Sequence, residues 1–282
     1  MAFVTTGARV SVPSPAAPRL SAHLRLVCVC LALSIAAACA SAPKRPPVGS
    51  LEPDKFLFEN GTTALDDKRW FVAREYFRQL VDSYPQSPYR ADAKLGIGDT
   101  YLGERSLESQ LLSINEYREF LSFYPTHPRA DYAQFKLGMS HYYQMRGPER
   151  DQTETKEAIA ELAAFMARFP NSPLAPEART RLREARDRLS MSEYRVGVFY
   201  YRQRWYPGAA DRFTATLKSD PEFSHRDGIY FYLAQVFLKA GRPAEALPYL
   251  DKLVKEFEQS EFLVPAQQQI DEIKSGAVKT AK

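Results

Sequence analysis

The stretch GIGDTYLG at residues 96–103 superficially looks like a glycine-rich loop that could bind phosphate. Its glycines lack the GxGxxG spacing, and a phosphate loop of this kind must follow a β-strand. The residues around it instead place apolar side chains three and four positions apart, which is typical of helices. We therefore interpret these glycines as points where helices pack closely against each other.

The residue types that could bind a metal or catalyse a reaction are few and scattered. The four histidines, His23, His127, His141 and His225, show no spacing typical of metal ligands. The sequence also lacks the GxxxxGK motif of nucleotide-binding loops, the HExxH motif of zinc enzymes and the GxSxG motif of hydrolases. Folding could still bring two carboxylates together as an acid–base pair. We predict no metal, no cofactor and no enzymatic activity.

The three cysteines all lie near the N-terminus, at or before Cys39, which excludes a disulfide framework or a thiolate zinc site in the rest of the chain. The apolar run Leu26–Ala38 is 13 residues long, too short to span about 30 Å of hydrocarbon as a helix. Arg19, His23 and Arg25 precede this run, and small residues end it. This pattern predicts a signal peptide at residues 1–38.

Two kinds of processing fit this N-terminal segment. Ordinary cleavage after Ala38 fits the small residues, whereas a cysteine directly after them fits a bacterial lipoprotein with a lipidated Cys39. The lipobox resemblance covers four residues, with Ala36 where leucine is usual. Residues 39–53 would form a Pro-rich tether. Because Ala40, not Asp, follows the cysteine, we expect a lipid anchor in the outer membrane, on its periplasmic face.

The net charge does not favour nucleic acid as a partner. Lys and Arg number 38 against 34 Asp and Glu, and Arg9, Arg19 and Arg25 account for most of the difference. Without the signal peptide the chain is nearly neutral, so no global attraction to nucleic acid is expected.

A short motif recurs three times, as YPQSPYRADA at 84–93, YPTHPRADYA at 124–133 and FPNSPLAPEA at 169–178. The first proline of each motif would end one helix. Ser87 or Ser172 would cap the next helix, and Pro88, Pro128 and Pro173 would take its first position, where a missing N–H costs nothing. Each motif therefore predicts a hinge between antiparallel helices.

Small and apolar residues before these hinges recur at fixed spacing. Gly61, Ala73, Phe77, Leu80 and Pro85 are 12, 4, 3 and 5 residues apart, and Gly197, Ala209, Phe213, Thr216 and Pro221 repeat that spacing. Ala234, Ala246, Leu250 and Leu253 repeat its first three intervals. This pattern resembles the tetratricopeptide repeat (TPR). It predicts an all-α, right-handed TPR solenoid of about five repeats.

The second and third units contain extra residues, in GERSLESQ at 103–110 and MRGPERDQTETKE at 145–157, which we expect to lie between the two helices of each unit. A longer interval before the fourth unit predicts a long connecting helix from Ser172 toward Tyr201. The predicted organisation is repeats 1–3 at 54–171, the connecting helix with repeats 4–5 at 172–274, and a tail at 275–282.

The first helices of the repeats would line the concave face of such a solenoid. Five positions on this face are predicted to bind a substrate peptide: Phe58, Thr62, Arg90, Lys94 and Tyr101. This aromatic and basic mixture suits an extended peptide with aromatic side chains and an anionic terminus. The alternative is that Leu65, Ile97 and Tyr101 belong to the core between repeats.

The signal, tether, repeats, hinges and insertions together resemble the BamD family, the TPR lipoproteins of the outer-membrane β-barrel assembly machine. Residues 58–102 carry the strongest match. The resemblance implies a scaffold whose N-terminal repeats receive the C-terminal segment of unfolded β-barrel proteins. Its C-terminal repeats would dock on a POTRA domain of the central barrel protein, together with accessory lipoproteins. Arg212 matches a basic position that meets this partner in the family, or is an ordinary solvated arginine.

Two other classes of protein share parts of this pattern. A different envelope TPR lipoprotein, such as a secretin pilot or a coordinator of cell-wall synthesis, would have the same anchor and solenoid. A periplasmic enzyme with a TPR region would need a catalytic domain, for which no residues remain outside the repeats.

Overall fold

The computed structural model describes residues 43–276. The predicted signal peptide and Cys39 lie outside these residues. The chain divides into two units between Arg45 and Pro46, and all the helices below belong to the second unit.

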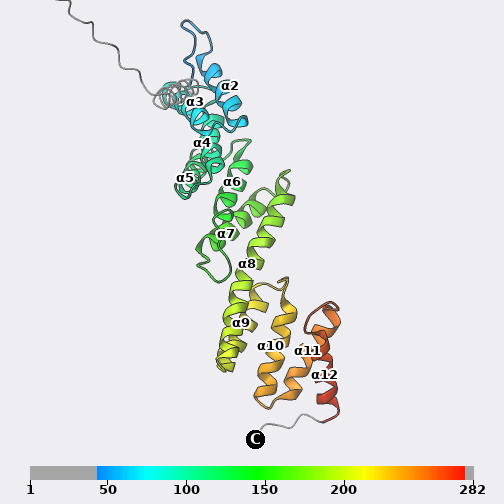
Figure 1. Ribbon diagram of the computed structural model, residues 1–282. Coiled ribbons are helices and arrows are strands. Elements are labelled where there is room, and N and C mark those ends of the chain that lie inside the picture. The colour runs from blue at the N-terminus through cyan, green and yellow to red at the C-terminus, as the bar shows by residue number, and fades with distance from the viewer. Residues whose placement is uncertain (1–42, 277–282) are drawn as a thin grey trace, which may run out of the picture. The chain divides into compact units, whose positions relative to one another are not determined.

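Residues 43–276 fold entirely as helices joined by turns and loops, without a β-strand (Figure 1). In chain order the helices are α2 (Pro53–Asp66), α3 (Trp70–Ser83), α4 (Arg90–Glu104), α5 (Leu107–Phe123), α6 (Ala130–Tyr142), α7 (Thr153–Arg168), α8 (Ala175–Arg202), α9 (Tyr206–Ser219), α10 (Arg226–Lys239), α11 (Pro243–Glu256) and α12 (Leu263–Lys274). None of them combines the length and the apolar character that crossing a bilayer would require.

Each helix packs mainly against the helices before and after it in the sequence. The helices therefore form five successive pairs, α2/α3, α4/α5, α6/α7, α8/α9 and α10/α11, followed by α12. The hydrophobic core is correspondingly a series of clusters along the chain rather than one central cluster. This confirms the predicted TPR-type solenoid, and α8, with 28 residues, is the predicted long connecting helix.

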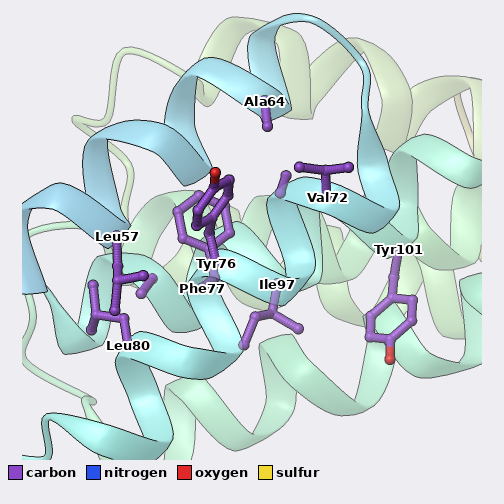
Figure 2. Close-up of a cluster of buried hydrophobic side chains, with 10 residues drawn as sticks. Leu57, Ala64, Val72, Tyr76, Phe77, Leu80, Ile97 and Tyr101 are labelled. Atoms are coloured by element: carbon purple, nitrogen blue, oxygen red, sulfur yellow. The ribbon is translucent and has the colours of Figure 1, made fainter. Parts of the chain in front are cut away.

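The glycines of the repeats mark the closest helix contacts. The buried ring of Phe77, on α3, lies between Gly61 of α2 and Gly96 of α4, in the cluster that Figure 2 shows. A Cβ atom at Gly96 would lie 2.5 Å from this ring. Gly98 and Gly103 of α4 similarly face the rings of Tyr117 and Trp70. The interpretation of GIGDTYLG as a packing segment is therefore confirmed.

The first hinge differs in detail from the prediction. Helix α4 begins at Arg90, so Pro88 lies in the preceding turn and not at the first helical position. The Arg90 N–H donates to the Ser87 carbonyl at 3.2 Å, which forms a tight turn before the helix. The Ser87 hydroxyl accepts from the Tyr89 N–H at 3.1 Å. The serine therefore satisfies a backbone donor of this turn and does not cap the helix itself.

The hinge serines also join neighbouring repeats, which the sequence pattern did not reveal. Each donates to an aspartate in the first turn of an earlier first helix: Ser87 to Asp54 at 2.7 Å, Ser172 to Asp131 at 2.6 Å and Ser260 to Asp227 at 2.6 Å. The last of these bonds forms in the segment where the hinge motif is no longer recognisable.

The predictions for the two insertions differ in how well they agree with the structure. The prediction for the second repeat is wrong, because only Arg105 and Ser106 separate α4 from α5 and most of the extra residues are helical. The Ser106 hydroxyl accepts from the Ser109 N–H at 3.1 Å and caps α5, which lets the helix begin early. In the third repeat, residues 143–152 do form a loop between α6 and α7.

Candidate functional site

Two of the predicted peptide-binding residues lie on α2. The Phe58 ring stacks on the Tyr89 ring of the first hinge, with 5.1 Å between centroids. The Thr62 hydroxyl donates to the Phe58 carbonyl at 2.9 Å. Both side chains are half-buried, so each keeps one face accessible.

Two further predicted residues, Arg90 and Lys94, lie on α4. Their charged groups contact other residues of the protein. The Lys94 ammonium contacts Glu119 at 2.8 Å and Glu116 at 3.4 Å, both on α5. The Arg90 guanidinium donates to the Tyr124 hydroxyl at 3.1 Å. These contacts hold α4 to α5 and to the second hinge.

Tyr101 belongs to the core between α3 and α4, which is the alternative left open by its sequence position. Its side chain is only 6% exposed, and Ile97, one turn away, is 4% exposed (Figure 2). The Tyr101 hydroxyl accepts a hydrogen bond from Arg78. The Arg74 guanidinium lies over the ring, 4.2 Å from its centroid.

A cavity of about 700 Å³ opens where the α2–α3 turn, the end of α4 and α6 come together. We call it the α2–α6 pocket. Its lining residues are Leu65, Lys68, Trp70, Asp99, Leu102, Gly103, Arg105, Tyr132, Lys136 and Tyr143. None of the five residues predicted to bind the peptide lines this pocket, and of its lining only Leu65 was considered from the sequence, as a core residue between repeats.

The α2–α6 pocket has an excess of positive charge. Three lining residues are cations, Lys68, Arg105 and Lys136, against one carboxylate, Asp99. Within residues 43–276 none of the three cations forms a salt bridge.

Asp99 is held against the wall of the pocket. Its Oδ1 accepts hydrogen bonds from the hydroxyls of Tyr117 at 2.7 Å and Tyr132 at 2.8 Å. Burial raises the pKa of Asp99 despite these two bonds and the nearby Lys136. The two tyrosine hydroxyls therefore satisfy one oxygen of the only carboxylate that lines the pocket.

Two of the cations sit on unusual backbone. Lys68 and Arg105 have positive φ angles of 59° and 58°, as does Arg204, at 61°, in the α8–α9 turn. In the fifth repeat the corresponding residue is Gly241, with a φ of 70°. A residue with a Cβ loses about 1–2 kcal/mol in this conformation. Glycine would therefore be the cheaper residue at each of these turns.

Aromatic rings form the apolar part of the pocket. Trp70, Tyr132 and Tyr143 contribute them. The Arg105 guanidinium lies 5.3 Å from the Tyr143 ring centroid, and the Lys136 ammonium lies 5.2 Å from that of Tyr132. Cations placed beside aromatic faces suit a ligand that combines an apolar ring with a negative group.

Arg212, the predicted partner-binding residue, is exposed on α9 and pairs with Glu193 of α8 at 2.7 Å. It lines a second cavity, of about 550 Å³, formed by α7, α8 and α9. Its guanidinium is accessible from solvent and lies on the junction between the third and fourth repeats.

The histidine spacing did not reveal one further cluster. His141 of α6 lies beside Glu157 and Glu161 of α7, and their possible ligand atoms are all within 4.8 Å of one another. A search for His–His spacing misses this group because its other members are glutamates on a different helix.

The helix pairs define the class of the molecule as a TPR protein. Residues 229–260, which include most of α10 and all of α11, match the model of the tetratricopeptide repeat. Residues 51–244 match the model of YfiO, described as an outer membrane lipoprotein. The chain belongs to the BamD family of outer membrane lipoproteins, as its resemblance implied.

Curated relatives share this relationship at modest identity. The chain is 30% identical over 212 residues to the outer membrane protein assembly factor BamD of Caulobacter vibrioides, covering 74% of this chain and 68% of the relative. It is 28% identical to the BamD of Vibrio cholerae, covering 65% of this chain and 78% of the relative. Among solved structures, the MamA protein is similar at 16% identity with a TM-score of 0.34, covering 74% of this chain and 93% of MamA.

Proposed function

We propose that this chain is a non-enzymatic scaffold of outer-membrane protein assembly that binds the C-terminal segment of unfolded β-barrel proteins. The assembly role is supported by membership in the BamD family and by relatives named as assembly factors. The binding role is supported by one observation above all, the cations without salt bridges that line the α2–α6 pocket together with aromatic rings.

In this proposal the terminal carboxylate of the substrate meets Lys68, Arg105 and Lys136, and an aromatic side chain packs between the pocket rings. Phe58, Thr62, Arg90 and Lys94 stay a prediction as further contacts along α2 and α4.

The remaining parts of the proposal concern anchoring and docking. The chain associates with the outer membrane, and lipidation of Cys39 would hold it on the periplasmic face. The C-terminal repeats would dock on a POTRA domain of the central barrel protein, with Arg212 as one contact. Arg212 supports this because it is exposed at a repeat junction and its only salt bridge among the described residues is with the similarly exposed Glu193.

The peptide site is tested with a ten-residue peptide that ends in phenylalanine, prepared with a free carboxylate and as the amide. We expect the amide to bind at least fivefold more weakly, since it lacks the terminal charge. Lys68→Gly removes one cation at a position where the backbone already favours glycine. This variant should bind the free-acid peptide several-fold more weakly than the wild type and bind the amide with unchanged affinity, as measured by fluorescence anisotropy.

Arg204→Gly is the matched control, because it makes the same change at the same kind of turn outside the pocket. Its affinity for both peptides should equal that of the wild type. Equal affinity of the wild type for acid and amide, or an equal loss in both variants, would contradict the proposed site.

A further inference from the structure

A buried histidine lies among carboxylates between α6 and α7, apart from the α2–α6 pocket. His141 is 4% exposed and lies on α6. Glu154, Glu157 and Glu161 follow one another along a single face of α7, three and four residues apart. The Nδ1 of His141 is 2.8 Å from a Glu154 carboxylate oxygen. Glu157 and Glu161 offer the other oxygens within 4.8 Å.

The neighbours of His141 determine which ring nitrogen carries the proton. A carboxylate only accepts hydrogen bonds, so Glu154 requires the proton on Nδ1. On the other side, the Nε2 atom is 3.4 Å from an Nη2 atom of Arg118. A guanidinium only donates, so it requires a lone pair on Nε2. Both neighbours therefore select the tautomer whose Nε2 can bind a metal.

This arrangement has the features of a metal ligand held by a second layer of contacts. A metal-bound histidine usually donates its other ring N–H to a carboxylate, which fixes the ring and raises its basicity. Glu154 is placed to do this for His141. Glu161 is also oriented, because the Gln134 side-chain amide donates to its carboxylate at 2.7 Å.

The charge of the cluster leaves room for a divalent cation. Three carboxylates face His141, and the salt-bridge partner of Glu161 is Arg118, at a long 3.8 Å. The Arg118 side chain is 50% exposed, so it can move into solvent. It stands on the Nε2 side of the histidine, where a metal ion would have to enter.

We propose that His141, Glu157 and Glu161 bind one zinc ion, with Glu154 positioning the histidine and Arg118 competing with the metal. One imidazole with two carboxylates suits zinc or a similar transition ion, whereas magnesium and calcium prefer oxygen ligands alone. Ligand distances of about 2.0–2.2 Å require the three ligand atoms to move closer together. Exposed Glu157 permits that movement, and water would complete the coordination.

The site would join α6 to α7 across the 143–152 loop. The ligands come from both helices of the third repeat, so a bound ion would stabilise the folded repeat, and more so as the free ion concentration rises above the Kd. This role does not depend on the peptide-binding proposal, and its failure would leave that proposal intact.

The experiment is a titration of Zn²⁺ into the untagged full chain, followed by isothermal calorimetry. The three cysteines are alkylated beforehand, because thiolates would bind zinc themselves. We expect one equivalent to bind, with no comparable binding of Mg²⁺. Glu157→Gln should weaken binding at least tenfold. Glu154→Gln should weaken it by about 10–100-fold, the range for outer contacts of metal ligands.

The variant Arg118→Ala distinguishes a metal site from a cluster that is held only by salt bridges. Removal of a competing cation should tighten zinc binding several-fold, whereas a purely structural role would give no gain. Glu108→Gln, on an exposed residue of α5, is the control and should bind like the wild type. The proposal is overturned if the wild type shows no one-equivalent binding, if Glu157→Gln binds equally well, or if Arg118→Ala binds more weakly.

Discussion

Asp220 shows how a single buried charge joins the two helices of the fourth repeat. It follows α9 and is 5% exposed. Its Oδ1 accepts from the Arg183 guanidinium of α8 at 2.8 Å. Its Oδ2 accepts from the Ser190 hydroxyl at 2.6 Å. Burial alone would raise the pKa of Asp220, but the bonds from Arg183 and Ser190 outweigh burial and lower it.

The lowered pKa determines how stability depends on pH. Since the folded pKa lies below the ordinary value of 3.8, the stabilisation is present above pH 3.8 and is lost as pH falls through the folded pKa. Asp220→Asn should lower the free energy of unfolding at pH 7 by about 2 kcal/mol, the scale of hydrogen bonds to a charged group. Urea denaturation at pH 7, 5 and 3 should show the difference from wild type narrowing at the lowest pH.

Asp211→Asn is the control for this prediction, because Asp211 is exposed on the same helix, α9. Its unfolding should match that of the wild type at all three pH values. A difference between Asp220→Asn and the wild type that stays constant from pH 7 to pH 3 would show that the charge of Asp220 is not what stabilises the junction.

The α2–α6 pocket could not be predicted from the sequence at the residue scale. The sequence pattern selected Arg90, Lys94 and Tyr101 because the first helices line the concave face of a solenoid. It could not show that Lys94 pairs with α5 or that Tyr101 is covered by Arg74 and Arg78. The overlooked signal was a basic residue at the turn after the first helix. Lys68 and Arg204 each follow the repeat glycine by seven residues.

At the scale of the helices, glycines without a side chain determine how closely neighbouring helices pack. The Phe77 ring fills the space that Gly61 and Gly96 leave between α2 and α4. Gly96→Ala would place a Cβ atom 2.5 Å from that ring, and the ring has no free space because it is 1% exposed. We expect a loss of about 1–3 kcal/mol, the usual cost of overpacking a core, as measured by urea denaturation.

Thr63→Ala on α2 is the control for Gly96→Ala. Thr63 is exposed, and alanine is the better helix former, so stability should stay equal or rise. Unchanged stability in Gly96→Ala would mean that α2, α3 and α4 can move apart without cost, and that the glycine does not set their spacing.

The elements themselves were largely predictable because helices and turns depend on local sequence. Proline and glycine spacing located every hinge from 84 to 178, and an unusually long interval between glycines predicted α8. The insertion in the second repeat was misplaced because its length, not its helix signals, was used. Ser106 and Ser109 supply a cap that turns extra residues into helix. The Ser–Asp bonds between repeats depend on tertiary contact, so spacing within one repeat could not predict them.

At the scale of the whole molecule, the two proposed binding surfaces lie on different repeats. The α2–α6 pocket belongs to the first three repeats, whereas Arg212 lies on the fourth. If the proposed roles are correct, substrate binding and partner docking are separate properties. A substitution at Arg212 should then abolish docking and leave the affinity for the free-acid peptide unchanged.

Arg212→Glu reverses an exposed charge and breaks the pair with Glu193. In a pull-down of the tagged chain from membranes in mild detergent, we expect the wild type to recover a barrel protein that carries POTRA domains, and the variant to lose it. Exposed ion pairs contribute about 0–1 kcal/mol, so the fold should survive the change. A circular dichroism spectrum checks that it does.

Lys218→Glu provides the matched control, because Lys218 is also exposed on α9 and forms no salt bridge among the described residues. It should recover the barrel protein like the wild type. Recovery by the wild type and both variants would keep the scaffold role and move the docking surface away from Arg212. Recovery of a secretin or a cell-wall synthase in place of a barrel protein would contradict the assembly role itself. Peptide binding by the α2–α6 pocket would then need a different substrate, since the cations and aromatic rings that line it would be unchanged.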